Sequence, residues 1–391
     1  MVVTQIAVSM VLLCASTLLV RSFWNLRNQN LGMQTRSILT ANISLGHQHY
    51  ETTRKQMQFF TQAEAAVRRS PGITAVAISD SLPPSGWHRE SIYNVMAVFG
   101  RPPAVNGAGT GGMVASRWVT PEYFRALAVP IVAGRNFTEE ERTSTEHPMI
   151  LGKLFADRLF PGENPLGQRI RPSPADPFYT VVGVAANVKN SGLSSSDEPE
   201  YYLLRRNVPE DWGQSSVLIL ESSVPSQALA PWVRSQIANI DPTVPVEIQT
   251  MNERISKLAD GPRFEAALLG FFALTGLTMA VIGLYGLTSY IAQRRTQEIG
   301  VRMALGADRS DILRLIAWEG LRLILFGGAL GLAGAFAAGR LLRNFLFSID
   351  SHDPVTFAGV AVLLGIVAMA ATLIPARVAM RVDPMIALRC D

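Results

Sequence analysis

A glycine-rich stretch has the spacing of a nucleotide-binding site. Gly107, Gly109 and Gly112 match G-x-G-x-x-G, a pattern that lets the backbone approach the phosphates of a dinucleotide. Such a site requires a strand directly before the glycines and a helix directly after them. Here Arg101-Pro-Pro precedes them, and the next helix signal, Thr120-Pro-Glu, comes eight residues later. We therefore interpret the stretch as a loop.

Other motifs that carry chemistry are missing from these 391 residues. The sequence contains no G-x-x-x-x-G-K-[ST] phosphate loop, no G-x-S-x-G and no H-E-x-x-H. His47 and His49 could share a metal on one strand face, but no third ligand is evident. Cys14 and Cys390 lie at opposite ends of the chain, which excludes a disulfide framework. We expect no catalytic residue, cofactor or metal, and we do not expect an enzyme.

The segment from residue 293 to residue 314 is the part most suited to contact another molecule. Ile299, Met303 and Leu305 form a short apolar patch among charged residues, and Gly306 is placed to end a short helix. A patch rimmed by charge suits docking to a protein, whereas arginines on an interfacial helix suit anionic lipid. The residues alone do not choose between the two. We assign this contact to Arg294, Arg295, Glu298, Gly300, Arg302, Leu305, Gly306 and Ala307.

Small residues recur at a spacing of four further along the chain. They are Gly327, Gly331, Ala335 and Gly339. This spacing aligns them on one helix face, where another backbone can approach closely. The alternative is the general enrichment of glycine in membrane helices. We predict tight packing of this face within a bundle or a dimer.

Four stretches without charged residues determine how these features are positioned. They cover residues 1–20, 266–292, 323–339 and 354–376. A bilayer-spanning helix needs about 20 mostly apolar residues, so each stretch predicts a span, the third extended back to Leu315. The first stretch could instead be a signal peptide, but it lacks a basic start and a small-residue cleavage site. We expect helices at 1–22, 264–292, 315–341 and 354–376, an extracytoplasmic domain at 23–263, a cytoplasmic loop at 293–314, a short turn at 342–353 and a cytoplasmic tail at 377–391.

The distribution of arginine predicts the orientation in the membrane. Nine arginines lie between the second and third charge-free stretches and in the tail, against only Arg340 and Arg343 between the third and fourth stretches. Because short cytoplasmic loops are enriched in basic residues, the loop and tail are placed in the cytoplasm. Arg21 and Arg27 oppose the rule, but a long segment translocates regardless of charge. The domain between the first two spans then lies outside the cytoplasm.

That domain has the pattern of a mixed α/β fold. Residues 179–185 and 216–221 are predicted as strands. Residues 50–69 and 231–239 are predicted as helices, and residues 100–112 as a loop. The whole chain is 48% apolar and 17% charged with a net charge of +4. This composition excludes disorder, coiled coil and nucleic-acid binding. The predicted fold class is an α-helical membrane protein with four transmembrane helices and an inserted mixed α/β extracytoplasmic domain of two lobes.

Several motifs resemble the FtsX-like/MacB-like permeases of ABC transporters. The loop Gln297-Glu-Ile-Gly-Val-Arg-Met-Ala-Leu-Gly-Ala307 is similar to their signature loop. Asp353-Pro354 and the segment 375–389 resemble the turn before their last span and their C-terminal motif. In the inserted domain, residues 129–135 and 160–167 are similar to a MacB-like periplasmic core domain. The resemblance covers essentially the whole chain.

The resemblance implies a non-catalytic permease subunit of an export or mechanotransmission complex in the bacterial inner membrane. A separate cytoplasmic ATPase would act on the loop, and the helices would move the periplasmic domain. The implied partners are this ATPase, lipid, and a second copy or a sister half as a dimer. The start of the chain resembles one half of duplicated orphan permeases, and this resemblance implies a half-unit or a fragment. Alternative functions are a membrane-anchored scaffold or regulator of periplasmic proteins, and an orphan permease without an ATPase.

Overall fold

The long apolar helices form one of two structural units. The computed structural model describes residues 2–70, 72–84, 89–92, 97–101, 113–193, 198–294, 309–342 and 353–379. One unit comprises residues 1–29 and 259–391, and the other comprises residues 30–258. The chain therefore leaves the first unit once, builds the second, and returns.

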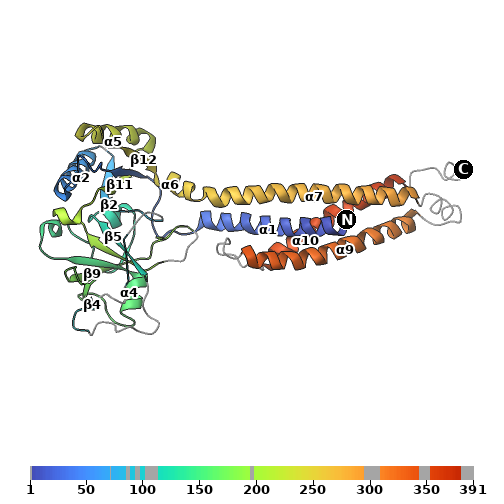
Figure 1. Ribbon diagram of the computed structural model, residues 1–391, viewed down its shortest axis with the longest axis horizontal. Helices are drawn as coiled ribbons and strands as arrows, with labels where there is room; N and C mark the ends of the chain where they lie inside the picture. The colour runs from blue at the N-terminus through green and yellow to red at the C-terminus, as the bar shows by residue number, and fades with distance from the viewer. Residues whose placement is uncertain are drawn as a thin grey trace. The chain divides into compact units, whose positions relative to one another are not determined.

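Four helices in the first unit are long and apolar enough to cross a membrane, which confirms the four predicted spans. They are α1 (Val2–Asn28), α7 (Asp260–Arg294), α9 (Arg309–Leu342) and α10 (Pro354–Ala379). They run side by side (Figure 1), and α1 contacts each of the other three. Apolar side chains surround each helix with little amphipathic bias, as expected for helices that face lipid and one another.

The second unit, which we call the ectodomain, is built on a single mixed sheet. Its strands are β1 (Ile38–Ser44), β2 (Ile73–Ser79), β3 (Arg89–Ile92), β4 (Ala97–Val98), β5 (Met113–Val119), β6 (Ile131–Gly134), β7 (Pro148–Gly152), β8 (Arg169–Arg171), β9 (Tyr179–Ala185), β10 (Glu200–Leu204), β11 (Ser215–Ser222) and β12 (Val246–Thr250). Its helices are α2 (Thr53–Arg68), α3 (Tyr123–Ala126), α4 (Lys153–Leu159), α5 (Ser226–Ile240) and α6 (Met251–Leu258), with 3₁₀ turns η2 (Glu140–Thr143) and η3 (Pro209–Asp211).

The sheet has two parts joined by a narrow junction. Its strand order is β12-β1-β11-β2-β5-β10-β7-β9-β8-β4, with β3 on β5 and β6 on β9. Between β2 and β5 the pairing is the single pair Ser79 and Val119. The first and last strands of the ectodomain, β1 and β12, are antiparallel neighbours. Both chain connections to the membrane unit therefore leave from one end of the strand order.

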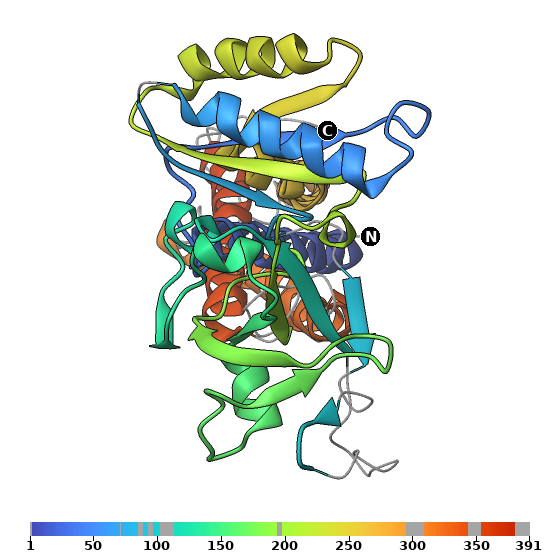
Figure 2. The same cartoon turned by 90° about the vertical axis from the view of Figure 1, so that its left-hand side faces the viewer.

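Helices α2 and α5 cover one face of the first part of the sheet, as Figures 1 and 2 show. In α2, buried Phe60, Ala63 and Val67 recur at helical spacing and pack on the sheet with buried Leu218 of β11. This periodicity explains why the segment is an amphipathic helix. Thr52 caps its start by accepting the backbone N–H of Lys55 at 3.4 Å.

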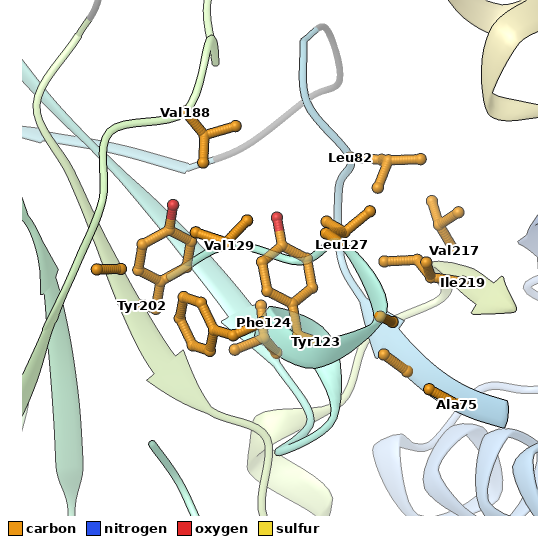
Figure 3. Close-up of a cluster of buried hydrophobic side chains, with 14 of the residues drawn as sticks. Ala75, Leu82, Tyr123, Phe124, Leu127, Val129, Val188, Tyr202, Val217 and Ile219 are labelled. Carbon is orange, nitrogen blue, oxygen red and sulfur yellow. The ribbon is translucent and has the colours of Figure 1, made fainter. Parts of the chain in front are cut away.

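The opposite face of the sheet carries a second apolar core. Tyr123 and Phe124 of α3 pack against Tyr202 of β10, with the Phe124 and Tyr202 ring centroids 4.9 Å apart (Figure 3). Leu82, which follows β2, and Val217 of β11 belong to the same cluster. This core extends across the junction and so joins the two parts of the sheet.

Most predicted ectodomain elements are confirmed, with one correction. The strand predicted at residues 179–185 is β9, the strand at 216–221 lies in β11, and the helix at 50–69 contains α2. The helix predicted to begin at Pro231 begins five residues earlier, at Ser226, so that prediction was wrong about the start. Proline removes only one backbone N–H, and packing of buried Val233 and Ile237 on the sheet maintains the helix through it. Residues 102–112 of the glycine-rich stretch lie outside the described residues.

Candidate functional site

Helix α1 is the central element of the membrane unit. In its most apolar window 44% of the residues are buried, against 17% for α7, 22% for α9 and 33% for α10. It packs most extensively against α7 and α9. A displacement of α1 would therefore displace both neighbouring helices, because close-packed elements move together.

Polar side chains of α1 meet glycines of α7. Ser9 Oγ donates a hydrogen bond to the backbone oxygen of Gly276 at 2.7 Å. A Cβ atom added to Gly283 would collide with the Gln5 amide, and one added to Gly276 would lie 3.4 Å from Ser9 Oγ. The facing pairs are Gln5 with Gly283, Ser9 with Gly276 and Ser16 with Gly270. Interhelical hydrogen bonds and close backbones are a usual means of holding membrane helices together.

The small-residue face of α9 lies against the other side of α1. A Cβ atom added to Gly331 would lie 2.5 Å from Met10 Cβ, and one added to Gly327 would lie 2.8 Å from Ile6 Cβ. The remaining predicted members of the face, Ala335 and Gly339, are buried as well. Two of the four residues thus contact a helix of the same chain. Packing of this face in a dimer stays a prediction.

An ion pair connects α1 to the start of α10. Arg21 pairs with Asp353, and Arg21 Nη1 also donates to Thr356 Oγ1 at 2.8 Å. Asp353 in turn accepts the backbone N–H of Thr356 at 3.0 Å and so caps α10. The hydrogen bonds from Thr356, together with the Arg21 charge, lower the pKa of Asp353. The end of α1 and the beginning of α10 are therefore linked by charge.

The predicted loop contact lies almost wholly outside the described residues. Arg294 is described: it is the last residue of α7, and its guanidinium lies 5.5 Å from the Tyr290 ring centroid. The predicted residues outside the described part are Arg295, Glu298, Gly300, Arg302, Leu305, Gly306 and Ala307. Their role stays a prediction.

Within the described part of the chain, no group of three or more histidine, cysteine, aspartate or glutamate residues could hold a metal ion. The ring nitrogen Nδ1 of His47 lies 2.7 Å from Gln214 Nε2. His47 therefore has a protein partner at this ring nitrogen.

Two sets of contacts among the membrane helices were not predicted from the sequence. The polar residues Gln5, Ser9 and Ser16 break an otherwise apolar run at helical spacing, a signal that could have identified a packing face. Asp353-Pro354 followed by Thr356 is a helix-start signal, but nothing in the sequence indicates that Arg21, more than 330 residues away, is its partner.

Comparison with known families agrees with this architecture. Residues 2–238 match the family model of the MacB-like periplasmic core domain, and residues 270–384 match the FtsX-like permease C-terminal model. The first match covers more than half of the chain, and the second includes α9, α10 and most of α7.

Curated relatives are similar to the chain over much of its length. The probable syringafactin export ATP-binding/permease protein SyfD of Pseudomonas syringae pv. tomato is 28% identical over 284 residues, which cover 70% of this chain and 42% of that protein. The macrolide export ATP-binding/permease protein MacB of Shewanella sp. is 27% identical over 282 residues, covering 69% and 42%. The pyoverdine export ATP-binding/permease protein PvdT of Pseudomonas entomophila is 29% identical over 278 residues, covering 67% and 41%. The chain thus spans less than half the length of these relatives.

A crystal structure of the periplasmic region of MacB from Actinobacillus actinomycetemcomitans aligns with a TM-score of 0.41 at 13% identity, covering 59% of this chain and 97% of that one. The two family models together cover both the inserted domain and the apolar helices of this chain. The chain belongs to the family of permeases with an FtsX-like C-terminal region and a MacB-like periplasmic core domain, and it is a multi-pass inner-membrane protein with its periplasmic core domain between the first and second helices.

Proposed function

We propose that the chain is a non-catalytic permease subunit in which ATP hydrolysis by a separate ATPase drives motion of the periplasmic domain. Its 391 residues contain no phosphate loop of the G-x-x-x-x-G-K-[ST] type. The relatives that it matches are named as proteins with ATP-binding and permease activities, and the chain spans 41–42% of those described above. In this proposal the ATP-binding activity belongs to a partner.

One structural observation carries the proposal. Helices α1 and α7 pack together, and the strands that follow α1 and precede α7 in the chain, β1 and β12, pair with each other. Leu39 of β1 pairs with Thr250, the last residue of β12, and α6 and α7 follow directly. The two helices that connect to the sheet, α1 and α7, pack on each other, and the two strands that they connect to, β1 and β12, pair with each other. A relative shift of α1 and α7 would therefore be transferred to neighbouring strands.

The packing inside the bundle supports transmission over its length. Contacts between α1 and α7 extend from Gln5 with Gly283 to Ser16 with Gly270. The close approaches at Gly327 and Gly331 bring α9 against the other side of α1. Tightly packed helices of this kind have discrete arrangements and do not deform continuously. A push at one end is thus expected to shift whole helices.

The loop between α7 and α9 is the proposed contact with the ATPase. It connects Arg294 to Arg309 and lies at the end of α7 that is remote in sequence from the periplasmic domain. Its alternating arginines and acidic residues around an apolar patch suit a small protein interface. We further propose that the functional assembly contains two permease chains, either two copies or a copy with a sister half, embedded in lipid.

Co-purification and ATPase measurements test the proposal. The full chain is purified from its native membrane in detergent, the co-purifying proteins are identified by mass spectrometry, and ATP hydrolysis is measured. Glu298→Arg and Gly306→Leu should each leave membrane insertion intact and abolish ATPase co-purification or stimulation, because a charge reversal or a bulky turn residue disrupts a small interface. Glu146→Arg, at an exposed ectodomain position, is the matched control and should behave as wild type.

Normal coupling in both loop variants would contradict the ATPase contact. Absence of any ATPase from the wild-type preparation would favour the orphan permease. A periplasmic hydrolase in its place would favour the scaffold or regulator.

A further inference from the structure

The outward side of α9 carries an aromatic residue and an arginine at each end of its span. The apolar span covers Gly320–Leu341. The guanidinium carbon of Arg322 lies 5.6 Å from the Trp318 ring centroid, and that of Arg340 lies 5.9 Å from the Phe336 ring centroid. Each arginine therefore lies over an aromatic ring that precedes it by about one helical turn.

The two pairs have the spacing of the two surfaces of a bilayer. Arg340 follows Arg322 by 18 residues, and Phe336 follows Trp318 by the same number. In an α-helix this is five complete turns and a rise of about 27 Å, so both pairs project from the same side of α9. The hydrocarbon core of a bilayer is about 30 Å thick, so each pair reaches one headgroup region. Because α7 starts at the periplasmic domain and crosses once, Arg322 lies in the cytoplasmic leaflet and Arg340 in the periplasmic leaflet.

The side of α9 between the two arginines is bulky, apolar and exposed. Leu325, Phe326 and Leu330 on this side are 60–67% exposed. The small residues Gly327 and Gly331 lie on the other side of the helix, where α1 approaches them. Interfaces between transmembrane helices are enriched in small residues, so the outward side of α9 is suited to lipid chains and not to a second closely packed helix.

The chain supplies no counter-charge for either arginine within its described part. Neither Arg322 nor Arg340 forms an ion pair with another described residue. The sequence has no acidic residue between Gly320 and Ile349, and Asp353, which follows at the same end as Arg340, is paired with Arg21. An arginine at the edge of the hydrocarbon core reaches toward the interface for a polar partner, and a phosphate can accept two hydrogen bonds from one guanidinium.

We propose that each end of this side of α9 binds an anionic phospholipid, with the lipid phosphate on the arginine and an acyl chain along the aromatic and apolar side chains. An anionic headgroup is favoured over a zwitterionic one, because the ammonium group of a zwitterionic lipid would bring a second cation to the arginine. The aromatic rings lie at headgroup level, where tryptophan is enriched in membrane proteins. This binding does not depend on the ATPase contact proposed above, since it is a property of the chain alone.

Quenching of tryptophan fluorescence by brominated lipid tests the proposal. The full chain is placed in nanodiscs of phosphatidylcholine with increasing fractions of phosphatidylglycerol whose acyl chains carry bromine. Brominated phosphatidylcholine is the matched probe. The difference between wild type and Trp318→Phe gives the signal of Trp318 alone. Phosphatidylglycerol should be preferred at Trp318 by about fivefold, the ratio that corresponds to about 1 kcal/mol for one arginine at an anionic surface.

Substitutions locate the two sites. Arg322→Met should remove the preference at Trp318, whereas Arg27→Met, at an exposed position near the end of α1, is the matched control and should retain it. Adding Phe336→Trp to Trp318→Phe moves the reporter to the other end of α9, where Arg340→Met should remove the preference.

Two further measurements exclude other partners of the arginines. Glu319 directly precedes the stretch without acidic residues, and Glu319→Gln should leave the preference at Trp318 as in wild type. Inorganic phosphate at constant ionic strength should not compete with phosphatidylglycerol, because it lacks the acyl chains that contact α9.

Several results would overturn the proposal. Absence of quenching by either brominated lipid would show that a second copy or another protein covers this side of α9. Equal quenching by the two lipids, or an unchanged preference in Arg322→Met and Arg340→Met, would exclude the arginine sites. A preference at least about fivefold stronger in Glu319→Gln would show that Arg322 is neutralised within the chain, and competition by inorganic phosphate would assign the sites to a free anion. The comparison of the two lipids needs only the conservative Trp318→Phe change, so it holds even where another variant fails to fold.

Discussion

Replacing Glu200 with glutamine should destabilise the ectodomain strongly, because it leaves the Arg117 guanidinium buried without its counter-charge. Arg117 is fully buried and Glu200 is 4% exposed. Glutamine can keep an oxygen toward Tyr202 and Asn190 but turns its amide NH₂ toward Arg117, so the change removes both the charge and the hydrogen bond of the pair while keeping the size of the side chain. Removing one partner of a buried ion pair costs about 3–5 kcal/mol. For a domain of this size, that loss lowers Tm by roughly 6–20 °C.

Thermal and urea unfolding of the full chain in detergent measures the effect. Trp118 and Trp212 lie in the ectodomain, and intrinsic fluorescence reports their exposure. Glu51→Gln removes a carboxylate at an exposed position and serves as the matched control. It should change stability by no more than about 0.5 kcal/mol.

A double substitution distinguishes the charge effect from a packing effect. Arg117→Met combined with Glu200→Met replaces the pair by apolar side chains, which is often close to neutral. The double variant should therefore be more stable than either single variant. A Glu200→Gln protein within about 1 kcal/mol of wild type, or a double variant whose loss equals the sum of the single losses, would refute the reasoning.

Three further predictions concern the membrane helices and one partly buried tyrosine. Gly331→Leu should destabilise the bundle by about 1–3 kcal/mol in detergent unfolding monitored by circular dichroism, since its Cβ would overlap α1. Gly328→Leu, with open space around its Cβ, should change little, and equal losses would contradict the packing. Arg21→Asp should lower Tm, and adding Asp353→Arg should restore part of the loss; no restoration would exclude a direct pair. Burial and a hydrogen bond to a carboxylate raise the pKa of Tyr50 to about 12, so its stabilising contribution is complete below about pH 10 and is lost as the pH rises through 12. Ultraviolet phenolate titration of wild type against Tyr50→Phe should show this late step.

The location of the membrane helices and of the inserted domain follows from the sequence. Water is absent from the bilayer core, so spans must be long, apolar and uncharged, and four charge-free stretches meet this requirement. The same local rules identify α2 from its apolar spacing and β9 from its run of β-branched residues. Such patterns repeat within a few residues and depend on no distant contact.

The partners of these elements were decided only by the tertiary structure. The spacing of Gly327 and Gly331 indicates a packing face, but only the fold shows that this face receives α1. The pairs Arg21 with Asp353 and Arg117 with Glu200 join residues far apart in the chain, and no local periodicity connects them. A charge is buried only where the folded chain supplies its counter-charge, so its partner and its consequence are properties of the three-dimensional arrangement.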